Sequence, residues 1–432
     1  MREKELIVYR DFGKEGRILS DMAWILRHYQ EKQEKARAKL YACMSGLLGL
    51  AGTHGFSGNL WHCYLSNLLV NHENSYSRSC EIRGAVEGTV NEAVLHDIAI
   101  FRELFEFDFA GAARALQVPE FLQALSYTGN EQESRVYNTR IRDRICTLAV
   151  RLSQAASAEE MKERLTEFYR EYGVGKFGLH KAFRIGHKRT GDGEEAVVIE
   201  PILNIAHVRL SDLVGYETAK KKLVENTEAF VAGRKANNCL LYGDAGTGKS
   251  SSIKAIANEY YDRGLRIIEV YRHQFRDLND VIAQIKHRNY KFIIYMDDLS
   301  FEDFETEYKY LKAVIEGGLE KKPDNVLIYA TSNRRHLIRE KFSDKREQDD
   351  DLHANDTVQE KLSLVYRFGV TIYFGAPDKA QFQQIVKTLA ERNGITLPED
   401  ELLAEANKWE LFHGGLSGRT AQQFIDYLSG TR

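Results

Sequence analysis

The sequence predicts an α/β fold: a parallel sheet covered by helices, preceded by a mostly helical domain and followed by a small helical one. Three observations support this. From residue 238 onward, short apolar segments alternate with segments that carry apolar residues at helical spacing. A glycine-rich turn joins the first of these predicted strands to the first predicted helix. Residues 1–172 and 377–432 show mainly the helical pattern.

Length and composition limit the class of protein. A chain of 432 residues is longer than one hydrophobic core usually organises, so two or three domains are expected. A formal net charge of −3 argues against a uniformly basic nucleic-acid binder but allows a local basic patch. The five cysteines form no C-x-x-C pair, which predicts reduced thiols. With no signal-type N-terminus and no long apolar run, we expect a cytoplasmic protein that has no membrane partner.

Residues 1–172 are expected to form a helical accessory domain. Apolar residues recur at three- and four-residue steps in segments 18–27, 35–50, 60–70, 93–109, 133–152 and 158–172. His54 and His62 lie near Cys63, but their spacing matches no metal-ligand pattern, so ordinary packing is the preferred interpretation. Because no catalytic constellation stands out, the expected role of this domain is to bind an unidentified protein partner.

Residues 173–209 are expected to be a glycine-rich connector. The segment is basic, with Lys176, Lys181, Arg184, Lys188 and Arg189. Runs of charge are usually solvated, so an interdomain connector is the favoured interpretation. The alternative is a segment that contacts phosphate or nucleic acid, with Phe177 and Phe183 as stacking residues.

The turn from Gly243 to Ser250 matches the phosphate-binding pattern G-x-x-x-x-G-K-[ST] at every fixed position. In such a turn the glycines let backbone N–H groups point at an anion, and the following helix N-terminus favours negative charge. We expect Lys249 to reach the β- and γ-phosphates of ATP, and the hydroxyl of Ser250 to ligate Mg²⁺. The expected nucleotide contacts are Gly243, Asp244, Ala245, Gly246, Thr247, Gly248, Lys249, Ser250 and Ser251.

An ATP-binding core is expected over residues 210–376, with a helical lid over 377–432. The predicted strands are 239–242, 266–271, 291–296, 326–331 and 370–374. The predicted helices are 218–233, 249–261, 278–286 and 305–320 in the core, and 379–393, 399–409 and 419–428 in the lid. Several strands are continuous apolar runs, as expected when both faces of a parallel sheet are covered. A nucleotide then belongs at the carboxyl ends of the strands.

Polar side chains follow two of these predicted strands. Asp297 comes directly after an apolar strand, where it is expected to hold Mg²⁺, while Asp298 is expected to orient or deprotonate an attacking water. Asn333 follows the next strand and is expected to hydrogen-bond the γ-phosphate or that water. The alternative for Asn333 is a turn-forming residue at a strand end.

The Gly243–Ser250 loop, the Asp297-Asp298 strand end and Asn333 together resemble the AAA+ ATPases. The resemblance covers about residues 210–432 and implies further contacts. Val214 and Gly215 are similar to residues that contact adenine in that superfamily. It also implies ATP with Mg²⁺ and a homo-oligomeric ring.

Two arginines also match positions of this superfamily. Arg367 resembles the arginine finger, which enters a neighbouring subunit's site in trans, and Arg334 and Arg335 compete for that role. Arg419 opens a lid helix and resembles the second sensor arginine, which touches the γ-phosphate.

Segments 213–217, 297–302 and 331–337 are more specifically similar to a bacterial AAA+ family known as domain of unknown function 815. Two features depart from the usual AAA+ pattern. Asp298 stands where most active members have Glu, with Glu302 as a displaced substitute, which argues for slow hydrolysis. Segment 272–276 lacks the aromatic–apolar–glycine loop of ring-shaped protein unfoldases.

The expected function is an ATPase that couples ATP binding and hydrolysis to conformational change or remodelling of an unknown partner. Two alternatives remain open. One is a nucleotide-gated binding module with marginal hydrolysis. The other is a nucleic-acid remodeller or loader, which rests on the basic segment 176–189 alone.

Overall fold

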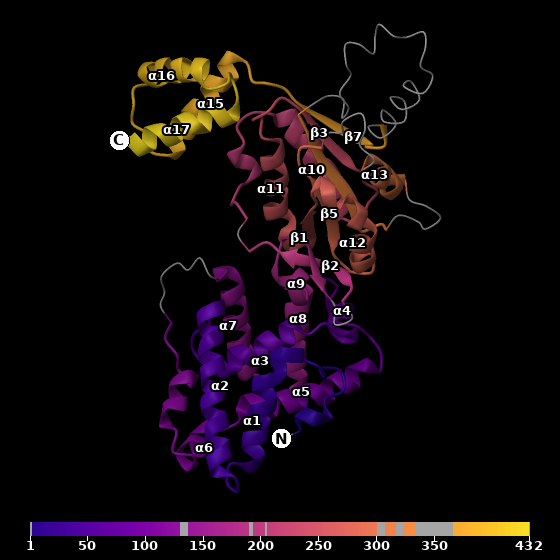
Figure 1. The fold of residues 1–432 in the computed structure, drawn as a ribbon, viewed down its shortest axis with the longest axis vertical. Coiled ribbons are helices and arrows are strands. Elements are labelled where there is room, and N and C mark those ends of the chain that lie inside the picture. The colour runs from indigo at the N-terminus through magenta and orange to yellow at the C-terminus, as the bar shows by residue number, and fades with distance from the viewer. Residues whose placement is uncertain are drawn as a thin grey trace. The chain divides into compact units, whose positions relative to one another are not determined.

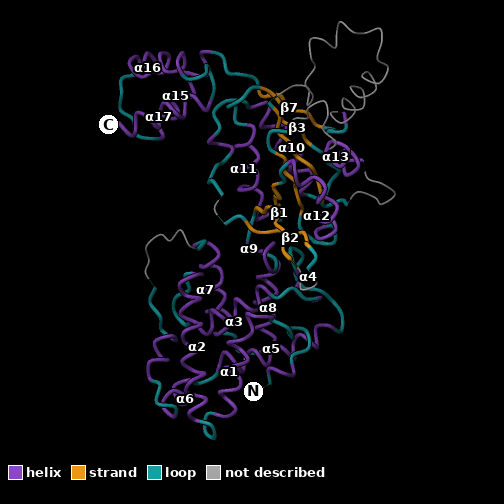
Figure 2. Tube along the Cα trace, in the orientation of Figure 1, coloured by secondary structure: helices purple, strands orange, loops and turns teal. Residues whose placement is uncertain are grey.

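The computed structural model describes residues 2–129, 137–189, 193–203, 205–299, 307–316, 323–333 and 366–431. The chain divides into two compact units, Met1–His180 and Lys181–Arg432. Figure 1 labels most of their helices and strands, and each unit is described by itself. Figure 2 shows helices throughout the first unit and the strands of the sheet gathered in the second.

The first unit is helical, as predicted. Its helices are α1 (Arg17–His28), α2 (Gln33–His54), α3 (Leu60–Asn71), α4 (Ser75–Cys80), α5 (Val90–Glu106), α6 (Phe109–Ala115), α7 (Thr139–Ser153), α8 (Ala158–Tyr172) and α9 (Gly175–Leu179). The six predicted helical segments correspond to α1, α2, α3, α5, α7 and α8, although residues 133–136 lie outside the described residues. The short helices α4, α6 and α9 were not predicted.

Helix α3 forms the centre of the first unit, because nearly all of its residues are buried. Asn59 begins it by accepting a hydrogen bond from the backbone N–H of His62 at 3.1 Å. Trp61 is fully buried, and its indole N–H donates to the carbonyl of Leu104 at 2.8 Å. His62 is half-buried, and its Nε2–H donates to the carbonyl of Phe105 at 2.9 Å, which is consistent with the predicted packing role.

The second unit contains a seven-stranded sheet in the order β2-β1-β4-β5-β6-β3-β7. Its strands are β1 (Ala182–Arg189), β2 (Glu195–Pro201), β3 (Cys239–Gly243), β4 (Leu265–Glu269), β5 (Lys291–Met296), β6 (Val326–Ser332) and β7 (Val370–Phe374). All neighbouring pairs are parallel except the β1–β2 hairpin. The predicted parallel sheet is therefore confirmed, and the carboxyl ends of β3, β5 and β6 lie at one edge.

Helices cover the sheet. Leu223 of α10 (Glu217–Val231) and Ile256 of α11 (Lys249–Tyr260) are buried in one cluster with Ile293 and Tyr329 of the strands. Helices α12 (Leu278–Ile285) and α13 (Glu307–Glu316) pack against each other on the other side of the sheet (Figure 1). The ends of the predicted helix 305–320 lie outside the described residues.

The lid forms a small core of its own. It consists of α15 (Lys379–Arg392), α16 (Glu399–Phe412) and α17 (Gly418–Thr431). Asp378 caps α15 by accepting from the backbone N–H of Gln381 at 2.8 Å, and the Gln381 side chain accepts from Asp378 in return. Across the described ranges, no helix combines the length and the apolar character that a membrane span requires.

The structure differs from the expected connector at residues 173–209. This segment contains the β1–β2 hairpin, and Ala182 of β1 pairs with Ile267 of β4, so the hairpin extends the sheet. Phe183 and Phe177 are buried, at 0% and 3% exposure, so neither ring is presented for stacking on a base. The glycines and basic residues hid the pattern of β1, in which the buried residues Phe183 and Ile185 alternate with the exposed Arg184.

Candidate nucleotide-binding site

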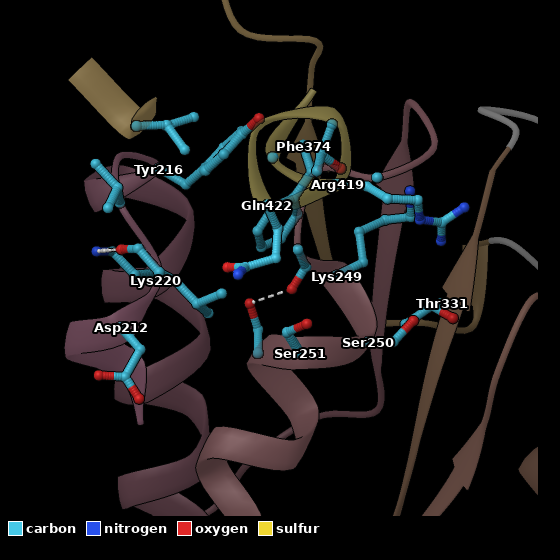
Figure 3. Close-up of a pocket in the computed structure, with 18 of the residues that line it drawn as sticks. Asp212, Tyr216, Lys220, Lys249, Ser250, Ser251, Thr331, Phe374, Arg419 and Gln422 are labelled. Atoms are coloured by element: carbon cyan, nitrogen blue, oxygen red, sulfur yellow. Dashed lines mark hydrogen bonds between the residues drawn. The ribbon is translucent and has the colours of Figure 1, made fainter. Parts of the chain in front are cut away.

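A cavity of about 600 Å³ lies at the carboxyl ends of the strands in the second unit. Its lining comes from α10 and the segment before it, the phosphate loop and the start of α11, the ends of β5, β6 and β7, and the lid. Figure 3 shows Asp212, Tyr216 and Lys220 on one side of the cavity, and Ser250, Thr331 and Arg419 on the other. This is the position that the parallel sheet predicted for a ligand.

The phosphate loop adopts a conformation that requires glycine at Gly243. Its φ is 132°, and a Cβ atom there would lie 2.1 Å from the carbonyl oxygen of Phe374 on β7. Gly246 and Gly248 also have positive φ, at 74° and 91°. Gly248 directly precedes α11, so the unpaired N–H groups of that helix face the loop.

Lys249 is held inside the loop. Its side chain is buried, and the ammonium donates to the carbonyl oxygens of Gly243 at 3.0 Å and of Asp244 at 2.5 Å. Burial lowers the pKa of Lys249, while Asp244, Asp298 and Asp297 act in the opposite direction. Carbonyl groups carry no net charge, so a phosphate group would be a stronger partner for this ammonium.

The Ser250 hydroxyl and the Asp297 carboxylate are in direct contact. Ser250 donates to Oδ1 of Asp297 at 2.7 Å, and Thr331 donates to the same oxygen at 2.5 Å. Partial desolvation by itself would raise the pKa of Asp297, but the hydroxyl groups of Thr331, Tyr295 and Ser250 hold it below its ordinary value. An ionised carboxylate beside a hydroxyl is the type of oxygen donor set that Mg²⁺ prefers.

Tyr295 adds a buried polar group next to this pair. It lies two residues before Asp297 on β5, so the two side chains leave the chain on the same face of the sheet. The residue is 4% exposed, and its hydroxyl makes no hydrogen bond of good geometry among the described residues, although it lies close enough to Asp297 to lower the pKa of that carboxylate. Burial and the charge of Asp297 raise the pKa of Tyr295. An orphaned hydroxyl here fits a site completed by a hydrated metal ion.

Asp298 and Asn333 also meet. The side-chain amide of Asn333 donates to Oδ1 of Asp298 at 2.7 Å. Asp298 has a φ of 51°, which is uncommon for a residue other than glycine, and its backbone N–H donates to Thr331 Oγ1 at 3.0 Å. Thr331 therefore fixes both neighbouring acids, since it bonds the backbone of one and the carboxylate of the other.

The lid contacts the phosphate loop at the first turn of α17. The backbone N–H of Arg419 donates to the carbonyl of Gly246 at 3.2 Å. Arg392 of α15 donates to the carbonyl oxygens of Ser211 at 2.7 Å and of Asp212 at 2.8 Å. The lid is thus tied both to the phosphate loop and to the segment before α10.

An apolar end of the cavity suits a planar base. Val214 lines it together with Ile385 and Leu389 of α15. Tyr216 has a φ of 60°; its ring lies 5.4 Å from that of Phe374, and its hydroxyl donates to the carbonyl of Gly375 at 3.0 Å. Lys220 donates to the carbonyl of Leu213 at 2.8 Å.

The structure places most of the predicted site residues at this cavity. Those that line it are Val214, Gly246, Thr247, Gly248, Lys249, Ser250, Ser251, Asp297, Asp298, Asn333 and Arg419. Gly215, Gly243, Asp244 and Ala245 belong to the same segments but are not among the lining residues. Arg367 is exposed and does not line the cavity of its own chain. Glu302, Arg334 and Arg335 lie outside the described residues.

Several lining residues escaped the sequence analysis. Gln422 lies one turn after Arg419 on α17, so helical spacing could have indicated it. Tyr216 lies in segment 213–217 and Thr331 in segment 331–337, but no pattern identified either residue as part of the site. Lys220 and Phe374 carry no recognisable signature, because only the fold brings them to the cavity.

The family model described as "Protein of unknown function (DUF815)" matches residues 181–432, which is more than half of the chain. The chain belongs to this family. The DUF815 match covers the whole second unit, including the β1–β2 hairpin. The sheet, the phosphate loop and the helical lid all lie within the matched residues.

Curated relatives of this DUF815 protein match shorter stretches. The replication factor C large subunit of Staphylothermus marinus is 38% identical over 74 residues, 17% of this chain and 17% of the relative. The chromosomal replication initiator protein DnaA of Borrelia garinii subsp. bavariensis is 25% identical over 182 residues, 41% of this chain and 34% of the relative. The chain therefore spans only a minor part of these relatives' lengths.

Two solved structures are similar to this DUF815 protein at low levels. A RuvB point mutant of Thermotoga maritima is 16% identical, with a TM-score of 0.36 over 50% of this chain and 64% of the other. The AAA domain of FIGL-1 in complex with ADP is 17% identical, with a TM-score of 0.36 over 53% of this chain and 74% of the other.

Proposed function

We propose that this DUF815 protein is an AAA+ ATPase that couples the binding and hydrolysis of MgATP to conformational change in an unidentified partner. The observation that carries the proposal is the convergence of three contacts at one cavity. These are the buried ammonium of Lys249, the Ser250–Asp297 pair and the Asp298–Asn333 pair.

The proposed binding roles follow from these contacts. Lys249 would exchange its carbonyl partners for the β- and γ-phosphates, aided by the backbone N–H groups of the loop. Ser250 and Asp297 would hold Mg²⁺, which when bound neutralises charge on the phosphate oxygens. Val214 and the aliphatic side chains of α15 would pack on the adenine.

The proposed catalytic roles fall on Asp298 and Asn333. Asp298 would accept a proton from, or orient, the attacking water, and Asn333 would align that water or the γ-phosphate. In the structure these two groups bond each other, so this bond must loosen before either can reach the water. Together with the short aspartate side chain, this supports a slow turnover.

The lid supplies the proposed coupling. Arg419 lies where the lid meets the phosphate loop, and its guanidinium would contact the γ-phosphate when ATP is present. Loss of that phosphate on hydrolysis would remove the contact and release α17 from the loop. The lid could then transmit the nucleotide state to a partner.

The experiment that tests this function uses Asp298→Asn in the full chain. Removal of the proposed base should cut ATP hydrolysis by about 100-fold or more, while ATP affinity stays within about threefold. Phosphate release and equilibrium binding measure the two quantities. Equal hydrolysis by Asp298→Asn and the unchanged protein would contradict the proposed role of this carboxylate.

A second candidate function is a nucleotide-gated binding module, which the Asn333–Asp298 hydrogen bond favours because it occupies the proposed base. ATP occupancy alone would then order the protein for a partner, with the helical first unit as the proposed contact. If so, the unchanged protein and Asp298→Asn should capture the same partner equally well with ATP. Capture only by Asp298→Asn supports the hydrolytic cycle instead.

A nucleic-acid partner remains a weaker proposal. The names of the matched relatives, a replication factor and a replication initiator, favour it, whereas the burial of Phe177 and Phe183 removes the proposed stacking residues. Binding of single- and double-stranded DNA, measured across salt concentrations, tests it, because phosphate contacts weaken steeply as salt rises.

A further inference from the structure

Two cysteines of the first unit are in contact although they are distant in the sequence. Cys63 lies on α3 and Cys146 on α7, and their sulfur atoms are 3.8 Å apart, with the thiol of Cys63 as donor. The two helices pack directly against each other. Nothing in the proposed ATPase cycle uses this pair.

The surroundings of the two thiols differ. Cys63 is 2% exposed, and its sulfur also lies 3.5 Å from the carbonyl oxygen of Ser57. Cys146 is only half-buried, so it is the more accessible residue of the two. The hydrogen bond between the two thiols, and then burial, raise the pKa of Cys63.

Cys146 is the more acidic partner. The hydrogen bond from Cys63 lowers the pKa of Cys146 below its ordinary value; burial opposes this shift, while the backbone of Ser57 and the charge of Arg142 support it. The remaining thiols behave oppositely: burial raises the pKa of Cys43 to about 12 and also raises those of Cys80 and Cys239. A partly exposed thiol with a lowered pKa is the one an oxidant attacks first.

We propose that Cys63 and Cys146 form a redox-reactive pair that a hydroperoxide converts into a disulfide joining α3 to α7. The Cys146 thiolate attacks the peroxide O–O bond, giving a sulfenic acid at Cys146 and releasing an alcohol, or water from hydrogen peroxide. The sulfur of Cys63 then attacks the Cys146 sulfur, forming the S–S bond and releasing water. In total, two thiols and one hydroperoxide give one disulfide, one alcohol and one water.

The geometry makes the second step accessible. A disulfide bond is about 2.05 Å long, so the two sulfur atoms need to approach by less than about 2 Å. We expect rotation of the two side chains to supply this approach. The product would tie the half-buried helix α7 to α3, the centre of the first unit, and a reductant would reverse it.

The test treats the reduced full chain with stoichiometric hydrogen peroxide and maps its peptides without reduction. We expect the loss of two titratable thiols per chain, a cross-linked peptide pair containing Cys63 and Cys146, and recovery of both thiols with dithiothreitol. Overoxidation of Cys146 without a cross-link, or thiol loss spread evenly over the five cysteines, would overturn the proposal.

Variants separate the pair from the other thiols. Cys146→Ser should remove both the cross-link and the fast-reacting thiol, whereas the control Cys43→Ser should keep both. Cys63→Ser alters the buried core, so its helical content is checked first; when folded, it should accumulate a sulfenic acid at Cys146 that dimedone traps. A cross-link that persists in Cys146→Ser would show that another cysteine is the reactive one.

The pH dependence gives an independent readout. The rate of thiol loss in the unchanged protein should level off at a lower pH than that of an ordinary thiol, because the pKa of Cys146 is lowered. A rate that keeps climbing beyond pH 9, as for an ordinary thiol, would contradict the proposal. None of these measurements depends on ATP hydrolysis. Their outcome therefore tests the cysteine pair independently of the proposed function.

Discussion

One carboxylate oxygen of Asp297 accepts hydrogen bonds from both Ser250 and Thr331. The Tyr295 hydroxyl lies near this carboxylate but makes no hydrogen bond of good geometry among the described residues. If Ser250 turns toward a bound metal ion, Asp297 loses one of these donors. Tyr295 is placed to replace it, either directly or through a metal-bound water. The Tyr295 hydroxyl would then have a hydrogen-bond partner in the metal-bound state.

Tyr295→Phe should therefore weaken Mg²⁺ rather than ATP. One hydrogen bond contributes about 0.5–1.5 kcal/mol, so the Mg²⁺ needed for half-maximal ATP binding should rise about threefold to tenfold. ATP binding in the presence of a chelator should not change. The measurement is a magnesium titration at fixed ATP.

Tyr329→Phe is the matched control for this change. Tyr329 of β6 is also buried, but its hydroxyl is hydrogen-bonded to Asn226 at 2.9 Å and to Thr227 at 3.1 Å. Its removal should lower stability without altering the magnesium requirement. If Tyr295→Phe and Tyr329→Phe have the same magnesium titration as the unchanged protein, Tyr295 has no role in the metal site.

At the scale of elements, the contact between the phosphate loop and β7 fixes the entrance of the site. Gly243 ends β3, and its backbone passes so close to Phe374 that only glycine fits. Strand β7 continues into Gly375, which accepts the hydrogen bond from Tyr216. Strand β7, which borders the phosphate loop, therefore also positions the side of the cavity that is proposed to hold adenine.

Gly243→Ala should destabilise the second unit by about 3 kcal/mol or more, because its Cβ meets backbone and its φ is unfavourable. Gly233→Ala is the control: its φ is also positive, at 74°, but its Cβ would meet open space, so only about 1 kcal/mol is expected. Urea unfolding measures both. Equal losses would show that the close approach at Gly243 does not matter.

The elements that sequence could predict are those with one strong pattern. The continuous apolar runs of β3, β5 and β6, and the glycine motif between β3 and α11, placed the loop and Asp297 correctly in the fold. The β1–β2 hairpin was missed because Gly186 and the basic residues of β1 weakened the alternation, although the β-branched run 197–199 was visible. On the side of the cavity proposed for adenine, the sequence indicated Val214 but not the other lining residues, since residues such as Phe374 reach it only through folding.

At the scale of the whole molecule, the proposed arginine finger requires a second copy of the chain. Arg367 is exposed and lies outside the cavity of its own chain. The proposed ring would bring this residue to a neighbour's site, where it would stabilise charge on the transferring phosphoryl group. Hydrolysis per chain should then rise with protein concentration.

Mixing two inactive variants tests this arrangement. Arg367→Ala keeps its own loop, and Lys249→Ala keeps the finger, so each alone should lose about 100-fold or more of the activity while a mixture regains part of it. Arg234→Ala, which alters another exposed arginine of the second unit, is the control and should stay active. A mixture no more active than its components would argue against a finger in trans at Arg367.

Binding of MgATP at the phosphate loop is the claim on which the other roles depend. Calorimetric titration should show one site per chain that Lys249→Ala weakens by about 100-fold or more, since a buried charge-assisted contact to phosphate is lost. Lys221→Ala, whose side chain is 77% exposed on α10, should bind like the unchanged protein. Equal MgATP affinity of Lys249→Ala and Lys221→Ala would contradict the account.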